Sequence, residues 1–157
     1  MERREFMAGA AAMAIAGMAS RVEAGQMTAE EKANIELVAG FCAAWATRDP
    51  KRILAFFADD GIYRMSETTP PVTGHAGILQ RLGSWIESSD KGIEFAILDT
   101  YAKGPMVVNH RIDRFMSSTR PLTWEGVGVF FLKDGKIREW SDYTIKVDRP
   151  AGVGPPV

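Results

Sequence analysis

The stretch "LTWEGVGVFFLKDGKIREWSDYTIKV" (residues 122–147) predicts two long β-strands joined by a tight turn. Both halves are rich in β-branched and aromatic residues, and Asp134-Gly135 between them is a typical hairpin turn. Two earlier segments, 93–102 and 106–116, have the same composition and are bounded by turn residues. The second half of the chain therefore predicts four consecutive, mostly antiparallel strands.

The first half of the chain predicts helices. Thr28 and Glu31 have the spacing of a capping box, and apolar residues then recur on one helical face as far as about Thr47. Asp49 and Pro50 form an N-cap and N1 pair that opens a second helix. The elements expected after this point are a helix over 50–58, a short strand over 61–65, a turn-rich connection over 68–75 and a helix over 76–88.

Helices followed by a run of antiparallel strands indicate an α+β domain in which the helices cover one face of a curved sheet. A sheet that curls over helices forms a cone, and the mouth of such a cone is a natural ligand pocket. The chain has 157 residues, of which 46% are hydrophobic and 25% are charged, and this suits one globular domain. We expect that domain over 25–148 and a flexible tail over 149–157.

Residues 1–24 have the character of an export signal. A charged start with Arg3-Arg4 is followed by a mildly apolar run over 7–19, and Val22-x-Ala24 resembles a cleavage site. The order Arg-Arg-x-Phe-Met resembles the twin-arginine signal. The signal predicts export to the bacterial periplasm, and a cytoplasmic location if the leader is not used.

Composition argues against several classes of function. The chain has 19 basic and 20 acidic residues with no block of either sign, which argues against a nucleic-acid-binding or anionic-membrane surface. Cys42 is the only cysteine, and His75 and His110 lack the spacing of metal ligands. Phosphate loops and dinucleotide-binding motifs are absent from the sequence. We therefore expect neither a metal nor a cofactor.

Charged residues stand out in the predicted strands. Alternation places Arg111 and Asp113 on one strand face, roughly 7 Å apart between Cα atoms, within reach of an ion pair. Asp142 in the last strand and Tyr63 in the first offer a second carboxylate and a phenol. Such residues are more often a structural ion pair or part of a solvated face.

Two aspartates around one arginine in a dry pocket would instead retain a shared proton, which makes one an acid and the other a base. Such a pair suits the addition of water to a strained ether such as an epoxide, because the base activates water while the acid protonates the leaving oxygen.

Three segments resemble the limonene-1,2-epoxide hydrolases of the SnoaL-like, NTF2-like superfamily. They are "RIDRF" (111–115), "GVFFLKDGKIREWSDY" (128–143) and "DGIYRM" (60–65), which precedes a Pro-Pro-x-x-Gly segment. The resemblance covers about residues 30–147. It implies an NTF2-like cone, a homodimer, and a one-step hydrolysis that needs no cofactor.

The resemblance also implies roles for individual residues. Asp142 would be the general base, Asp113 the general acid and Arg111 the bridge between them, with Tyr63 hydrogen-bonded to the attacking water. The family places an asparagine two residues after this tyrosine, where this chain has Met65. Ser66 and Asn109 are the polar residues that could replace it.

A pocket lined by apolar side chains favours a lipophilic substrate such as a terpene or sterol epoxide. The residues expected to bind it are Met65, Trp85, Phe115, Phe130 and Trp140. Two other functions stay open. One is an isomerase or cyclase of the ketosteroid-isomerase or polyketide-cyclase kind, and the other is a non-catalytic small-molecule binding module.

Overall fold

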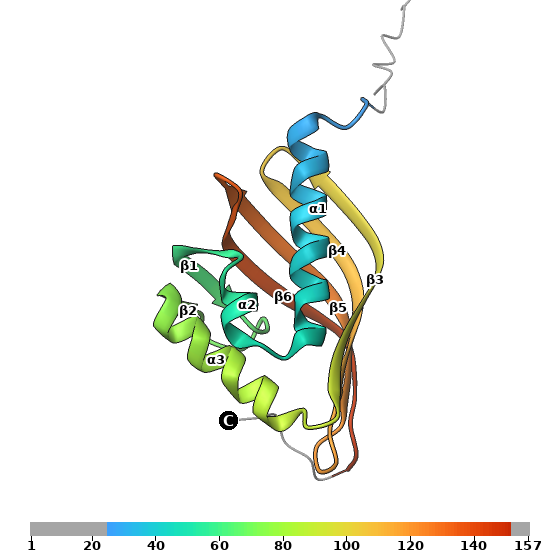
Figure 1. Ribbon diagram of the computed structural model, residues 1–157. Coiled ribbons are helices and arrows are strands. Elements are labelled where there is room, and N and C mark those ends of the chain that lie inside the picture. Colours follow the sequence, from blue (N-terminus) through green and yellow to red (C-terminus); the bar gives the residue numbers. More distant parts are fainter. Residues whose placement is uncertain (1–24, 152–157) are drawn as a thin grey trace, which may run out of the picture.

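The computed structural model describes residues 25–151, in which the helices lie against one face of a single curved sheet (Figure 1). This arrangement confirms the predicted α+β class. The expected export signal over 1–24 and residues 152–157 of the expected tail lie outside the described residues.

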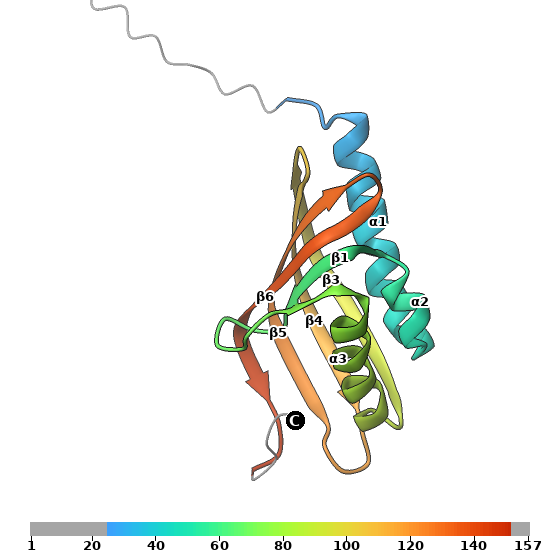
Figure 2. The same ribbon diagram turned by 90° about the vertical axis from the view of Figure 1, so that its left-hand side faces the viewer.

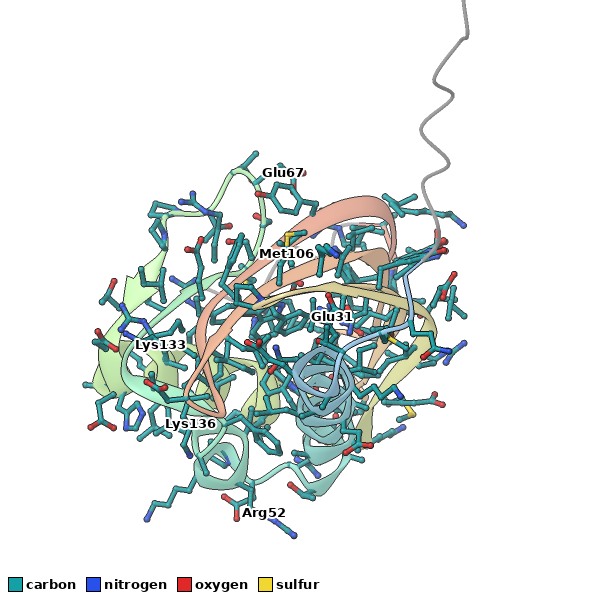
Figure 3. The ribbon with its side chains drawn as sticks, turned by 90° about the horizontal axis from the view of Figure 1, so that it is seen from above. Glu31, Arg52, Glu67, Met106, Lys133 and Lys136 are labelled. Atoms are coloured by element: carbon teal, nitrogen blue, oxygen red, sulfur yellow. The ribbon has the colours of Figure 1, made fainter. Side chains whose placement is uncertain are left out.

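The first helix begins and ends where the sequence predicts. In α1 (Ala29–Ala44) the hydroxyl of Thr28 accepts a hydrogen bond from the Glu31 backbone N–H at 3.1 Å, and the Thr28 N–H donates to the Glu31 carboxylate at 2.9 Å. A 3₁₀ turn, η1 (Trp45–Thr47), completes the element. The Glu31 carboxylate also accepts from the Gly104 N–H at 3.0 Å, which fixes the start of α1 to a strand turn. Figure 3 shows Glu31 beside α1, with the helix seen end-on.

The prediction of a helix over 50–58 was wrong at its C-terminal end. Helix α2 (Pro50–Leu54) stops early, and strand β1 (Phe57–Arg64) begins before the expected 61–65. The backbone N–H of Ile137 donates to Phe56 O at 2.8 Å, and Phe57 is in register with Ile137. Pairing with the last strand therefore places residues 57 and 58, which were predicted to be helical, in a β-strand.

The remaining elements complete the sheet. Helix α3 (Gly74–Ser88) follows β2 (Val72–Thr73), a two-residue strand inside the segment predicted as turns. The four long strands lie where the sequence predicts them, within a residue at each end: β3 (Gly92–Lys103), β4 (Met106–Met116), β5 (Leu122–Lys133) and β6 (Lys136–Asp148). Within residues 25–151 no helix is both long and apolar enough to cross a membrane.

The sheet has the order β2-β1-β6-β5-β4-β3, and every pair is antiparallel except β1 with β6. Register shifts occur in β3 between Ile97 and Asp99 and in β5 near Gly126 and Leu132. Such irregularities bend strands and increase their twist. All three helices lie on the same side of the bent sheet, while its other face is left uncovered (Figure 2).

The core lies between α1 and the concave face of the sheet. Phe41 of α1 has no solvent exposure, and its ring meets those of Trp45, Phe57, Phe130 and Trp140 edge-on. The shortest of these contacts, to Trp140, has a centroid separation of 4.9 Å. Burial of large aromatic side chains at this density typically stabilises a fold by about 3–5 kcal/mol for each residue.

Among the described residues, Arg111 is the one basic side chain in this core, and a glycine makes room for it. Gly126 of β5 is in register with Arg111, and Gly128 with Asn109. A Cβ atom at Gly128 would overlap the Arg111 guanidinium and lie 2.9 Å from Asn109 Oδ1. Gly128 therefore leaves space for the guanidinium, whereas a Cβ atom at Gly126 would overlap the Trp124 ring.

Replacing Gly128 with alanine should displace the guanidinium and destabilise the fold. We expect Gly128→Ala to lower the free energy of unfolding by about 1–3 kcal/mol in urea titrations, as overpacking of a core does. Gly83→Ala is the matched control, because a Cβ at Gly83 has no atom within 4 Å. That change in α3 should raise stability by up to about 1 kcal/mol. Equal stability of Gly128→Ala and wild type would contradict the position of Arg111.

Candidate active site

Arg111 joins three side chains in the interior of the cone. Its Nε donates to both carboxylate oxygens of Asp113, at 3.0 and 3.1 Å. Its Nη2 donates to both oxygens of Asp142, at 2.8 and 2.9 Å, and its Nη1 to Asn109 Oδ1 at 3.0 Å. All four residues are buried, with exposed fractions of 5% or less. The structure thus brings together the arginine and both aspartates named from the sequence.

The strand register explains how these groups meet. Asn109, Arg111 and Asp113 alternate along β4 and point to the concave face, whereas Asp142 comes from β6. Strand β5 runs between them, so the guanidinium has to cross a strand, with strands about 4.8 Å apart. It can do so only because Gly128, the partner of both Asn109 and Asp142, has no side chain.

Aromatic rings enclose the guanidinium. Arg111 Cζ lies 5.2 Å from the ring centroid of Phe95, 5.0 Å from that of Trp124 and 5.4 Å from that of Trp140. These distances suit cation–π attraction, which is strongest where water is excluded. The rings therefore stabilise the positive charge and keep solvent away from it.

Trp140 also orients Asp142. Its indole N–H donates to Asp142 Oδ1 at 2.7 Å, so this oxygen accepts bonds from Trp140 and Arg111 together. Asp142 Oδ2 accepts only from Arg111 among the described residues. One oxygen of Asp142 is thus fixed by two donors, and the other keeps a lone pair for a further partner.

Burial changes the proton affinity of each charged group. It raises the pKa of Asp113 to about 7, against the opposing effect of Arg111 and with a further increase from the charge of Asp142. It raises the pKa of Asp142 to about 6, and Arg111 and the Trp140 N–H limit the rise. Burial alone would lower the pKa of Arg111, but Asp142 and Asp113 outweigh it, so that this pKa lies above its usual value. The site thus favours a proton on Asp113, a negative charge on Asp142 and a permanent cation between them.

A small cavity of about 40 Å³ adjoins the two aspartates. Its lining residues come from helices and strands alike: Trp45, Tyr63, Met65, Trp85, Phe95, Asp113, Phe115, Leu122, Trp124, Trp140 and Asp142. This volume holds water but is far below that of ordinary ligand pockets, which begin at about 300 Å³. A substrate can enter only if a lining side chain moves.

Tyr63 places a phenol in this cavity. Its ring stacks on Trp140, with centroids 4.2 Å apart and planes 9° apart. Burial, followed by the negative charge of Asp142, raises the pKa of Tyr63 well above its usual value. The Tyr63 hydroxyl makes no hydrogen bond to another residue of 25–151, and it therefore remains a protonated donor free to bind water. Trp45 also lines the cavity, and its indole N–H is buried with no hydrogen-bond partner among residues 25–151.

Met65 lies where the resembled family has an asparagine, and it makes a different contact. Its Sδ accepts a hydrogen bond from Trp85 Nε1 at 3.0 Å. Neither polar candidate takes the place of the asparagine. Ser66 is bonded to Thr69 in the loop after β1, at 2.7 Å, and Asn109 lies behind Arg111, where it donates to Cys42 Sγ at 3.6 Å.

Four of the five residues expected to bind substrate line the cavity, namely Met65, Trp85, Phe115 and Trp140. Phe130, the fifth of these residues, does not line the cavity. It has no solvent exposure, stacks on Trp140 with centroids 5.7 Å apart and lies in the core beneath the cavity. Alternation places a side chain on the concave face but does not tell how deep it lies.

Three features of the site were missed in the sequence. Asn109 supports the guanidinium, Gly128 makes room for it, and the Trp140 N–H orients Asp142. Each carried a signal, because Asn109-x-Arg111 and Trp140-x-Asp142 share strand faces and glycine is unusual in a strand interior. In the described part of the chain, no three His, Cys, Asp or Glu side chains are grouped as metal ligands.

Residues 38–140 match the SnoaL-like domain family. The structure is similar to that of an LEH-like epoxide hydrolase from M. tuberculosis, with 25% identity, a TM-score of 0.64, and 73% of this chain and 84% of that chain covered. It is also similar to a protein of Jannaschia sp. CCS1 proposed to be a SnoaL-like polyketide cyclase, with 14% identity, a TM-score of 0.66, and 77% and 91% covered. No curated protein sequence shows a significant match.

The family match covers more than half of the chain and includes β1, β4, β5 and the start of β6 as far as Trp140. The element order and the curved sheet around α1 are those expected of the NTF2-like cone. The protein therefore belongs to the SnoaL-like domain family.

Proposed function

We propose that this protein is a cofactor-independent epoxide hydrolase that adds water to a lipophilic epoxide in one step. The observation that carries the proposal is the buried Arg111 bonded to both Asp113 and Asp142 beside a small cavity. The similarity to an LEH-like epoxide hydrolase at 25% identity supports the same chemistry.

In the proposed reaction, Asp142 takes a proton from a water molecule whose oxygen attacks one carbon of the oxirane. The bond between that carbon and the ring oxygen breaks, and Asp113 gives its proton to the departing oxygen, which yields a diol. Tyr63 donates a hydrogen bond to the attacking water. Return of one proton from Asp142 to Asp113 completes the cycle.

The charge of the cluster supports this sequence of steps. Before the reaction the cluster holds one carboxylate, one carboxylic acid and one guanidinium, and after it the two carboxyl groups have exchanged states. The net charge stays constant, so no unpaired charge has to form in a site that excludes water.

An isomerase or cyclase would use the same cavity differently. The similarity to the Jannaschia protein is the reason for considering this alternative. An enolate requires neutral donors aimed at one oxygen. Tyr63 and protonated Asp113 are such donors, but the guanidinium bonded to both aspartates has its clearest use in the exchange of acid and base.

Hydrolysis in ¹⁸O-labelled water should place the label in the diol during a single turnover, because water attacks carbon directly.

We expect Asp142→Asn to lower turnover of cyclohexene oxide or limonene oxide roughly 100- to 10,000-fold, the usual contribution of a general base. Circular dichroism should show a folded variant. Asp99→Asn, on an exposed aspartate of β3, is the matched control and should leave turnover unchanged.

Full activity of Asp142→Asn, or label that first appears in the protein, would overturn this assignment. Isomerisation of an enone without epoxide turnover would favour the isomerase alternative, and the absence of both reactions would favour the binding module.

The two raised pKa values predict a bell-shaped dependence of kcat/KM on pH. Activity should fall as the pH drops through about 6, because Asp142 gains a proton and cannot act as a base. It should also fall as the pH rises through about 7, because Asp113 loses the proton that it donates. Circular dichroism at each pH separates these limbs from unfolding. A flat profile between pH 5 and 8 would contradict the paired roles.

We also infer that the protein is a homodimer formed through the outer face of its sheet. Tyr101, Phe131, Tyr143 and Ile145 are exposed on the long strands, by 66%, 42%, 48% and 59%. The helices cover only the opposite face (Figure 2). Exposed apolar residues gathered on one face are typical of protein interfaces.

Light scattering coupled to size-exclusion chromatography should give twice the mass of the mature chain. The double variant Tyr143→Lys, Ile145→Glu should be a folded monomer, whereas Arg52→Glu on exposed α2 should stay dimeric. A monomeric wild type would refute this interface.

A further inference from the structure

A second pocket, of about 180 Å³, adjoins the acid–base cavity on the far side of Met65 and Trp85. These two residues line both spaces. The other walls of this outer pocket come from β2 and α3 and include Gln80, Arg81 and Ser84. The outer pocket is polar, whereas the inner cavity is mainly aromatic.

A weak contact between Met65 and Trp85 separates the two pockets. Trp85 Nε1 donates to Met65 Sδ at 3.0 Å, and a thioether is a weak acceptor. Methionine has a flexible side chain that adapts to other packings. Rotation of Met65 would therefore join the two pockets at little cost, and a substrate too large for the inner cavity would extend into the outer one.

Arg81 gives the outer pocket a positive charge. It is partly buried on α3, and no ion pair or hydrogen bond connects its side chain to another residue of 25–151. No aspartate or glutamate lines the pocket. A single cation without a partner, at the outer end of an apolar path, suits an anion of charge −1.

We propose that the substrate is an epoxide whose lipophilic body carries a carboxylate, and that Arg81 binds that carboxylate in the outer pocket. The oxirane would lie beside Asp113 and Asp142, and the body would pass Met65 and Trp85. This inference rests on the proposed hydrolase function and adds a specificity-determining residue to it. The carboxylate matches both the single charge and the two-pronged geometry of a guanidinium.

The test compares cyclohexene oxides that bear a carboxylate on a chain of one to four methylene groups with their methyl esters. Wild type should prefer the acid to the ester at the best chain length. We expect Arg81→Gln to lower the ratio of kcat/KM for acid over ester roughly 10- to 100-fold, as loss of a charged hydrogen bond does, mainly through KM. Arg81→Lys should keep part of the preference, because lysine keeps the positive charge but cannot bind both carboxylate oxygens as the planar guanidinium does.

Arg52→Gln, on exposed α2, is the matched control and should leave the acid-to-ester ratio unchanged. Calorimetry with the unreactive cyclohexyl-alkanoates provides a readout that needs no turnover, and Arg81→Gln should weaken that binding by the same factor. Equal use of acid and ester by both wild type and Arg81→Gln would overturn this inference and leave the hydrolase proposal intact. Carboxylate binding that depends on Arg81, without hydrolysis of any epoxide, would support the outer pocket and refute the hydrolase. Failure of the alkanoates to bind wild type would overturn the carboxylate assignment.

Discussion

A guanidinium with no solvent exposure is the constraint on which this structure depends. Taking a cation from water into a protein interior costs several kcal/mol, and it is tolerated only where the partners are close and complete. Arg111 satisfies this condition with two carboxylates and the Asn109 amide oxygen. Removing one member of such a buried pair typically costs about 3–5 kcal/mol, so β4 and β6 are tied together across β5 by more than backbone hydrogen bonds.

The same constraint produces the chemistry. Two aspartates that would both be ionised in water compete here for one cation, and burial raises the pKa of each. The Trp140 N–H favours the charge on Asp142, while Asp113 lacks a second donor among the described residues and has the higher pKa. A structural ion pair and a catalytic acid–base pair thus use the same contacts, and the difference between them lies in the cavity beside the carboxylates.

Local patterns of residues predicted much of this fold. The ends of β4 and β5 were predicted to the residue, because turn residues bound their alternating runs, and alternation also put Arg111 and Asp113 on one face. The sequence could not show that β6 would recruit residues predicted as the end of a helix, because that outcome depends on pairing between Phe57 and Ile137, far apart in the chain. The sequence also could not show how deep a side chain lies beneath the cavity. Phe130 and Trp140 face each other on neighbouring strands, yet only Trp140 reaches the cavity.

Met65 shows how a change in one residue alters both water binding and access. In the proposed reaction, an asparagine at this position would offer the attacking water a polar partner, whereas a thioether would leave that task to Asp142 and Tyr63. Met65 instead contacts Trp85, and this flexible, weakly hydrogen-bonded contact lies between the cavity and the outer pocket. Burial keeps the pKa values of the aspartates raised, and electrostatic interactions in such a buried site are stronger than in water. The residue that reduces the number of polar groups in the cavity therefore also adds to the apolar surroundings that raise these pKa values.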